Sequence, residues 1–285
     1  MMVTSSMSII STLIFPPPPS IFMTAMSVIS FTSLANAGIS EIRGKHMQYS
    51  KFWNFNNPEK TAPNSEKQQR QVVTLSGRTG MLVAYTPAFV TALTSLLFFP
   101  HNDIRSLLLS YALTLHFLKR ILEVQFVHKY SGGMGVDTAV PICLSYLLST
   151  GSMIYGQYLS SQGLGFPEPA IDMKSAGIVL FVIGISGNLY HHYLLSEMRA
   201  KPGEEKEYKI PKGGLFELVI CPHYLFEITT FLGISFISQT LYSFSFTAGT
   251  ALYLAGRSYA TRNWYRSKFK YHFPNNLKAL VPYVF

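Results

Sequence analysis

The chain has 285 residues, of which 48% are hydrophobic and only 13% are charged, and its formal net charge is +9. A soluble domain usually carries roughly 25% charged residues, so this composition argues against a soluble globular protein. The basic residues lie in loops without any recognition motif for DNA or RNA, which argues against nucleic-acid binding and favours contact with a membrane surface.

Seven apolar segments follow one another along the chain, each near the roughly 17–25 residues that cross a bilayer as a helix. They cover 21–38, 80–99, 104–124, 138–159, 175–195, 224–240 and 241–258. The last two adjoin, so six or seven helices are compatible with the pattern. We predict an all-α polytopic membrane protein, a bundle of about seven transmembrane helices. Residues 1–79 would form an N-terminal membrane helix and a cytosolic loop, and 80–285 one membrane domain.

The first apolar segment raises the question of a cleaved leader. SLANA (33–37) is similar to a signal-peptidase site. However, no positive charge precedes it, and FPPPPS (15–20) interrupts the apolar stretch. We therefore favour a retained first helix, with the prolines as a stiff lead-in.

The basic residues predict an orientation. Of the 23 Lys and Arg, seven lie in 40–79, five in 197–214 and six in 257–285. With seven spans, these segments share one side of the membrane, and only Arg105 and Lys174 fall on the other. The positive-inside rule makes the basic side cytosolic, so the N-terminus is expected in the lumen and the C-terminus in the cytosol.

The third apolar segment ends in LHFLKRILEVQFVHKYSGGM (115–134), which is rich in ionisable residues. Four of them share one face of a helix: His116, Lys119, Arg120 and Glu123. Glu123 is spaced to pair with either cation. The pattern fits a salt-bridged helix end at the interface or a polar wall facing the inside of the bundle. Apolar residues fill most of the remaining surface, which favours the polar wall.

The fifth segment ends in GNLYHHYLLSEMR (187–199). Ionisable groups at membrane depth cost roughly 2.5–3.5 kcal/mol each, so they tend to mark function unless the helix end lies in water. On a helix, Asn188, His192 and Arg199 fall within roughly 40° of one another. Glu197 points the other way and is expected in solvent.

The stretch LVICPHYLFEI (218–228) breaks an apolar run at Pro222 and then presents His223, Tyr224 and Glu227. Such groups are costly at membrane depth unless they line a cavity. Tyr224 could instead be a core residue whose hydroxyl hydrogen-bonds a free carbonyl. The chain has no GxGxxG or P-loop motif, and its two cysteines are far apart, so neither a soluble nucleotide-binding domain nor a metal site is expected.

These stretches resemble the steroid 5α-reductase family, which also contains the very-long-chain enoyl-CoA reductases. The resemblance rests on GNLYHHYLLSEMR, on KPGE, on YKIPKGGLFELVICPHYLFEI, and on GRSYATRNWY with the closing KALVPYVF. It begins at about residue 80 and is specific in the C-terminal half. It implies seven helices in the endoplasmic reticulum membrane, with NADPH held inside the bundle near the cytosolic face. It also implies hydride transfer to the β-carbon of a C=C bond conjugated with a carbonyl.

The resemblance also assigns roles to individual positions. The implied cofactor contacts are Asn188, His192, Arg199, Tyr208, His223, Arg257 and Tyr265. Arg199 would face a phosphate, for which a guanidinium is well suited. Tyr224 is the expected acid at the developing enolate, with Lys119 assisting it. Glu227 belongs to the same catalytic group and would orient the nicotinamide amide.

The chain departs from the family pattern at the substrate. Steroid-reducing members carry a Gln-Glu pair before PAF in the second span and a Tyr after the histidine of the third. Here AYTPAF places Ala84 and Tyr85 at the first position, and Phe117 occupies the second. The clamp for a steroid 3-oxo group is therefore missing or rebuilt. HFLKRILEVQFVHKYS and CPHYLFE resemble the enoyl-CoA reductase branch more closely, although that branch's usual ubiquitin-like domain is not evident in 1–79.

We therefore expect an NADPH-dependent oxidoreductase that reduces a lipid C=C bond conjugated with a carbonyl, of the 3-oxo-Δ4-steroid 5α-reductase type. The alternative within the family is a trans-2-enoyl-CoA reductase of very-long-chain fatty acid elongation. The expected partners are a lipid substrate, the membrane and other enzymes in that membrane. Two further classes stay open: an S-adenosylmethionine-dependent membrane methyltransferase, which shares a related C-terminal helix pair, and a catalytically inactive scaffold.

Overall fold

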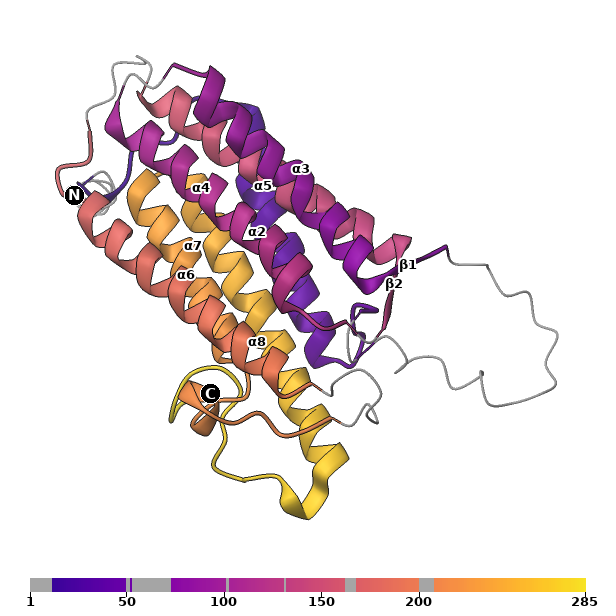
Figure 1. Ribbon diagram of the computed structural model, residues 1–285. Helices are drawn as coiled ribbons and strands as arrows, with labels where there is room; N and C mark the ends of the chain where they lie inside the picture. The colour runs from indigo at the N-terminus through magenta and orange to yellow at the C-terminus, as the bar shows by residue number, and fades with distance from the viewer. Residues whose placement is uncertain are drawn as a thin grey trace.

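The computed structural model describes residues 12–49, 52, 73–100, 103–130, 132–161, 168–199 and 208–285. Seven long helices run side by side in this part of the chain (Figure 1): α2 (Ile21–Ile42), α3 (Gly77–Phe98), α4 (Ile104–Leu122), α5 (Val136–Ser161), α6 (Lys174–Glu197), α7 (Pro222–Ser238) and α8 (Leu241–Phe269). Each predicted apolar segment therefore forms a helix. Much of the predicted loop 40–79 and the KPGE motif lie outside the described residues.

Four of the helices, α2, α3, α5 and α6, are long and apolar enough to cross a membrane. The other three, α4, α7 and α8, pack among them and carry many of the buried polar side chains. Large apolar residues remain exposed along the outer helices, for example Val28 and Ile29 on α2 and Val179 and Val182 on α6. This arrangement confirms the predicted all-α membrane protein.

The border between the last two helices is sharp. Gln239 adopts a left-handed conformation with φ of 51° and ends α7, and α8 begins two residues later. The helix α8 then continues to Phe269, well past residue 258, where the apolar run ends. The polar stretch RSYATRNWYRSKF contains no glycine or proline, so nothing in it stops the helix.

The helices pack in pairs, with α6 along α7, α2 along α8, and α3 against α4 and α5. Small residues allow the α2–α8 backbones to approach closely. A methyl group on Gly38 would lie 2.5 Å from the carbonyl oxygen of Leu252, and one on Gly256 would meet the backbone of Gly38. Close glycine contacts of this kind are typical of membrane helix interfaces.

Replacing Gly256 with leucine should therefore separate α2 from α8. Overpacking costs roughly 1–3 kcal/mol, so the thermal unfolding midpoint in detergent should fall clearly. Gly151→Leu is the matched control, because a methyl group at Gly151 on α5 would meet no atom within 4 Å. Equal midpoints for the two variants would contradict the close contact.

A buried arginine ties one end of the bundle together. Arg105, at the start of α4, donates to the backbone oxygen of Ile237 and to Oε1 of Gln239, each at 2.7 Å, and to Asp172 at 3.2 Å. Lys174 also pairs with Asp172, at 2.6 Å. Hydrogen bonds from Lys174 hold the pKa of Asp172 below its ordinary value. Arg105 and Lys174, which the sequence placed on the side of the membrane opposite the basic loops, thus lie at one end of the bundle.

A small sheet lies at the other end of α3 and α4. Strand β1 (Thr74–Ser76) leads into α3, and β2 (Gly133–Gly135) follows the end of α4. They pair antiparallel, with Leu75 opposite Met134. The C-terminal segment after α8 returns to the start of α7, where the backbone nitrogen of Ile220 donates to Lys278 at 2.9 Å. The sheet thus fixes the segment that follows the polar end of α4, and the C-terminal segment fixes the residues that lead into α7.

Candidate active site

The end of α4 carries the densest group of buried ionisable residues. Lys119 and Arg120 lie in its last turn, where cations are favoured by the helix dipole. The helix then widens into a π-helical turn, η3 (Glu123–Val127). The turn is closed by a 2.7 Å hydrogen bond from the backbone nitrogen of His128 to the backbone oxygen of Glu123. Such turns occur frequently at functional sites. Here the turn places Glu123 inside the bundle and lets the chain leave the helix at His128.

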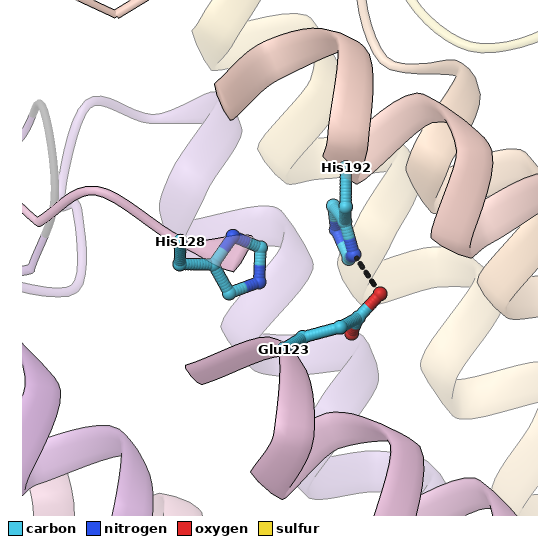
Figure 2. A group of neighbouring side chains, drawn as sticks. All are labelled: Glu123, His128 and His192. Atoms are coloured by element: carbon cyan, nitrogen blue, oxygen red, sulfur yellow. Dashed lines mark hydrogen bonds and ion pairs between the residues drawn. The ribbon is translucent and has the colours of Figure 1, made fainter. Parts of the chain in front are cut away.

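Glu123 is the centre of this group, and its side chain is only 1% exposed. Its Oε1 accepts a 3.0 Å hydrogen bond from Nδ1 of His192 on α6, as Figure 2 shows. The same oxygen lies 3.0 Å from Nζ of Lys119. Its Oε2 lies 2.9 Å from Nη1 of Arg120. One carboxylate thus contacts a lysine, an arginine and a histidine. The charged face of α4 is a polar wall inside the bundle, as the spacing predicted.

The same group continues to α7. Lys119 donates to the side-chain oxygen of Asn188, and the Asn188 amide donates to the backbone oxygen of His223 at 2.7 Å. The rings of His192 and His223 lie 5.3 Å apart. Three of the predicted cofactor residues, Asn188, His192 and His223, therefore gather around Lys119.

Arg120 turns from Glu123 toward α3, where the steroid clamp was expected to be missing. Its guanidinium donates to the hydroxyl of Tyr85 and lies 4.7 Å above the centre of that ring. The ring of Tyr146 packs 5.4 Å from Tyr85 and 5.5 Å from Phe117. Three aromatic rings and a cation thus fill the positions where the family pattern has its clamp.

A second pair of buried groups lies deeper in the bundle, and its polar atoms lack partners. Oε1 of Glu227 is 3.5 Å from Nε2 of His116. Oε2 of Glu227 and both ring nitrogens of His116 make no hydrogen bond to any described residue. His116 is enclosed by Phe117 and Phe231, each at 4.9 Å. Unpaired buried polar atoms are costly, so this pair suits a ligand that brings hydrogen-bonding groups of its own.

Three more predicted residues meet near the start of α7. Arg199 lies past the end of α6, and its guanidinium is 5.6 Å from the ring centre of Tyr208. The ring of Trp264 packs 4.8 Å from Tyr208 and 5.0 Å from Tyr265. Arg199, Tyr208 and Tyr265 therefore form one group, although the helical spacing that linked Arg199 to Asn188 does not extend to it.

Tyr224 lies between these groups. Its ring is 4.3 Å from His223 and packs against the apolar cluster that contains Tyr265. Its hydroxyl makes no hydrogen bond to a described residue. The alternative in which this hydroxyl bonds a free backbone carbonyl therefore has no support among the residues that the structure describes. Tyr224 connects with Lys119 only through Asn188 and the His223 backbone.

Arg257 has a different setting from the other predicted cofactor residues. It is buried on α8, with Nη1 2.6 Å from Oε1 of Glu41 on α2. Nδ1 of His46 lies 2.7 Å from the other Glu41 oxygen, and the rings of Tyr49 and Phe52 lie 4.5 and 4.2 Å from the guanidinium. An ion pair therefore already balances this cation. Its acidic partner was missed in the sequence, because Glu41 gives no signal beyond its place at the end of an apolar segment.

Glu123, His128 and His192 also raise the question of a metal site. One ligand atom from each lies within 4.8 Å of the others. However, Lys119 and Arg120 already contact the same carboxylate, and Nη1 of Arg120 is 3.3 Å from Nδ1 of His192. A divalent ion would be repelled by both cations at close range. The donor set therefore fits a metal poorly.

Comparison with known proteins gives the family. The family model described as 3-oxo-5-alpha-steroid 4-dehydrogenase matches residues 134–285. A very-long-chain enoyl-CoA reductase of Dictyostelium discoideum is 34% identical over 172 residues, which is 60% of this chain and 55% of that protein. Steroid 5-alpha-reductase DET2 of Gossypium hirsutum is 39% identical over 110 residues, 39% of this chain and 42% of that protein.

Polyprenal reductase 1 of Arabidopsis thaliana is 28% identical over 213 residues, 64% of this chain and 65% of that protein. The chain spans about half the length of the first two of these curated relatives. The relatives are named for different substrates, but the family match covers more than half of this chain and includes the polar ends of α6, α7 and α8. The chain belongs to the 3-oxo-5-alpha-steroid 4-dehydrogenase family, that is, to the steroid 5α-reductases and their enoyl-CoA reductase relatives.

Proposed function

We propose that this chain is an NADPH-dependent membrane reductase that saturates a lipid C=C bond conjugated with a carbonyl. The observation that carries the proposal is the joint burial of a charged Lys119–Glu123 pair and an unpaired His116–Glu227 pair inside one bundle. Charged residues inside a membrane bundle are expensive and mark functional sites. The reductase names of the relatives support the same chemistry.

The residues fit a nicotinamide cofactor in two places. The unpaired Oε2 of Glu227 suits the amide hydrogens of a carboxamide. Arg199, with Tyr208 and Tyr265 beside it, suits a phosphate and an aromatic base. Arg257 would contribute a cation shared with Glu41. When bound, NADPH supplies the hydride that the β-carbon receives.

The chain's own residues would then manage charge and a proton. Negative charge develops on the carbonyl oxygen, where the Tyr224 hydroxyl can donate a hydrogen bond and a proton. Lys119 supplies a positive charge to the same site, and Glu123 and Asn188 both bind its ammonium group. Asn188 passes this restraint to the His223 backbone and so orients Tyr224.

We favour an enoyl thioester as the substrate. Tyr85 and Arg120 bind each other where a steroid clamp would need two free polar side chains, and the enoyl-CoA reductase similarity covers more of the chain than the DET2 similarity. A 3-oxo-Δ4-steroid, the first expectation from the sequence, becomes the second candidate, and the family model's description supports it.

Purified full-length protein in lipid nanodiscs tests both substrates. NADPH consumption should be fast with a long-chain trans-2-enoyl-CoA and slow or absent with a 3-oxo-Δ4-steroid, and mass spectrometry should find the saturated product. Thermal stabilisation by S-adenosylmethionine and not by NADPH would indicate a methyltransferase. Stabilisation by neither cofactor would indicate a scaffold.

Arg199→Ala should weaken NADPH binding more than NADH binding if the guanidinium contacts the 2′-phosphate. A lost charge-assisted contact costs roughly 1.5–3 kcal/mol, or about ten- to a hundred-fold in affinity. Titration of both cofactors against the parental and variant proteins measures the difference. An equal loss would move Arg199 to the pyrophosphate, and no loss would remove it from the site.

The orientation is also open to a direct test. We propose an endoplasmic reticulum protein with its C-terminus in the cytosol, because the basic residues concentrate in 40–79, 197–214 and 257–285. A cysteine in place of Lys206 should react with a membrane-impermeant reagent from the cytosol, and one in place of Gln162 only from the lumen. Labelling of both from the same side would contradict the seven-span arrangement.

A further inference from the structure

The reaction proposed above gives no role to His128, a histidine beside the buried ion pairs of α4 and η3. It is the first residue past η3 and is half-buried, whereas Lys119 is 8% exposed and Glu123 only 1%. The His128 and His192 rings meet edge to face, with centres 4.7 Å apart (Figure 2). His128 therefore lies between the outer surface and the buried ion pairs.

From His128 inward, titratable groups lie next to one another, with a ring contact and not a hydrogen bond between His128 and His192. Nδ1 of His192 donates to Glu123 at 3.0 Å, and the same Glu123 oxygen lies 3.0 Å from Nζ of Lys119. Because Nδ1 of His192 is the donor, its Nε2 is the atom that can accept a proton from outside. This series of contacts ends at Asn188, which accepts a hydrogen bond from Lys119 and donates one to the backbone oxygen of His223, the residue before Tyr224.

Saturating a conjugated C=C bond consumes one proton in each turnover. The dihydronicotinamide is oxidised as it gives up a hydride, which forms the new C–H bond at the β-carbon, and the π electron pair of the C=C bond moves toward the carbonyl oxygen. The enolate then takes up one proton from the Lys119–Tyr224 side of the site, and this proton ends on the α-carbon of the saturated product. A proton must return to this buried group before the next turnover, and bulk water does not reach Glu123 directly.

We propose that His128, His192 and Glu123 form the route by which a proton returns to Lys119. His128 passes a proton to Nε2 of His192, His192 releases its Nδ1 proton to Glu123, and Glu123 hands it to Lys119. The net change is one proton taken up from water and one delivered to the reduced substrate. This route rests on the proposed reductase function, because only a reaction that consumes a proton needs it.

Several charged and titratable groups face the route: Lys119 and Arg120 on α4, Glu123 on η3, Tyr130 beside His128, His192 and His191 on α6, Arg199 beyond α6, and His223 on α7. Most of the permanent charges are positive, and Glu123 is the acid among them. A proton in transit would therefore not rest on either histidine, but would move on to Glu123. The two histidines would therefore transfer protons without holding one at rest.

The test compares His128→Gln and His128→Ala with the parental protein in nanodiscs, using NADPH and a long-chain trans-2-enoyl-CoA. Both variants should lose roughly a hundredfold in kcat in mildly alkaline buffer, the lower end of the range for lost proton transfer, with KM unchanged. Added imidazole should restore the kcat of His128→Ala, because free imidazole can take the place of the missing His128 ring. Acidic buffer should reduce the difference in kcat between the variants and the parental protein. The solvent deuterium isotope effect on kcat should be larger in the variants. His272→Gln is the control, because His272 is exposed on η5 (Lys270–His272).

Each other result counts against the route. Parental turnover by His128→Ala without imidazole would overturn it. His128 would have a structural role if the loss of kcat did not respond to imidazole or acid and showed no larger deuterium effect. The same conclusion would follow if a lowered unfolding temperature explained the loss of kcat. One bound metal per chain, with activity lost to a chelator, would replace the route with a metal site. If the parental protein reduced no enone or enoyl thioester, the proposed function would fail, and the route with it.

Discussion

Glu123→Gln should destabilise the protein strongly. The change removes the charge that balances Lys119 and Arg120, at 3.0 and 2.9 Å, but hardly alters volume. Both cations lie away from water, so they stay buried without a counter-ion. Removing one partner of a buried ion pair costs roughly 3–5 kcal/mol. Thermal unfolding of the full-length protein in detergent measures the loss.

The matched control is Glu197→Gln, which removes the same charge from an exposed position at the end of α6. Its unfolding midpoint should stay close to the parental value. Adding Lys119→Met to Glu123→Gln should recover part of the lost stability, since the double variant leaves one unpaired cation instead of two. A Glu123→Gln protein as stable as Glu197→Gln would show that the pairs contribute nothing.

The polar face of α4 could be predicted because it depends on local geometry alone. A helix turns by about 100° per residue, so the spacing of Lys119, Arg120 and Glu123 places them together wherever the helix lies. The same reasoning brought Asn188 and His192 to one face of α6. It did not extend to Arg199, because α6 ends at Glu197 and spacing beyond a helix end carries no information about direction.

Contacts between distant elements could not be predicted in the same way. The pairing of Glu41 with Arg257 joins α2 to α8 across most of the chain, and Arg120 reaches Tyr85 on a different helix. No local period encodes which helices become neighbours. The π-helical turn is also invisible to a pattern that assumes 3.6 residues per turn, so the direction in which His128 leaves the helix was missed.

Tyr224→Phe is expected to slow the chemical step by roughly 10²–10⁴-fold, the usual range when a general acid is lost. The variant removes one oxygen from a side chain whose hydroxyl makes no hydrogen bond to a described residue, so the fold should be unaffected. NADPH affinity should also survive, because the ring keeps its packing against His223. Single-turnover oxidation of bound NADPH, with an enoyl thioester and separately with a 3-oxo-Δ4-steroid, measures the step. Tyr271→Phe, at a side chain that is 99% exposed, is the control.

Lys119→Met separates the acid from its support. Lys119 reaches Tyr224 only through Asn188 and the His223 backbone, so its loss should slow the same step less than Tyr224→Phe does. The double variant should be about as slow as Tyr224→Phe alone, because two residues that serve one proton transfer do not lose rate independently. Fully additive losses would place Lys119 in a separate step. A Tyr224→Phe protein that reduced its preferred substrate at the parental rate would remove Tyr224 from the reaction. Glu227, whose Oε2 has no hydrogen-bond partner among the described residues, would then be the next acid to test.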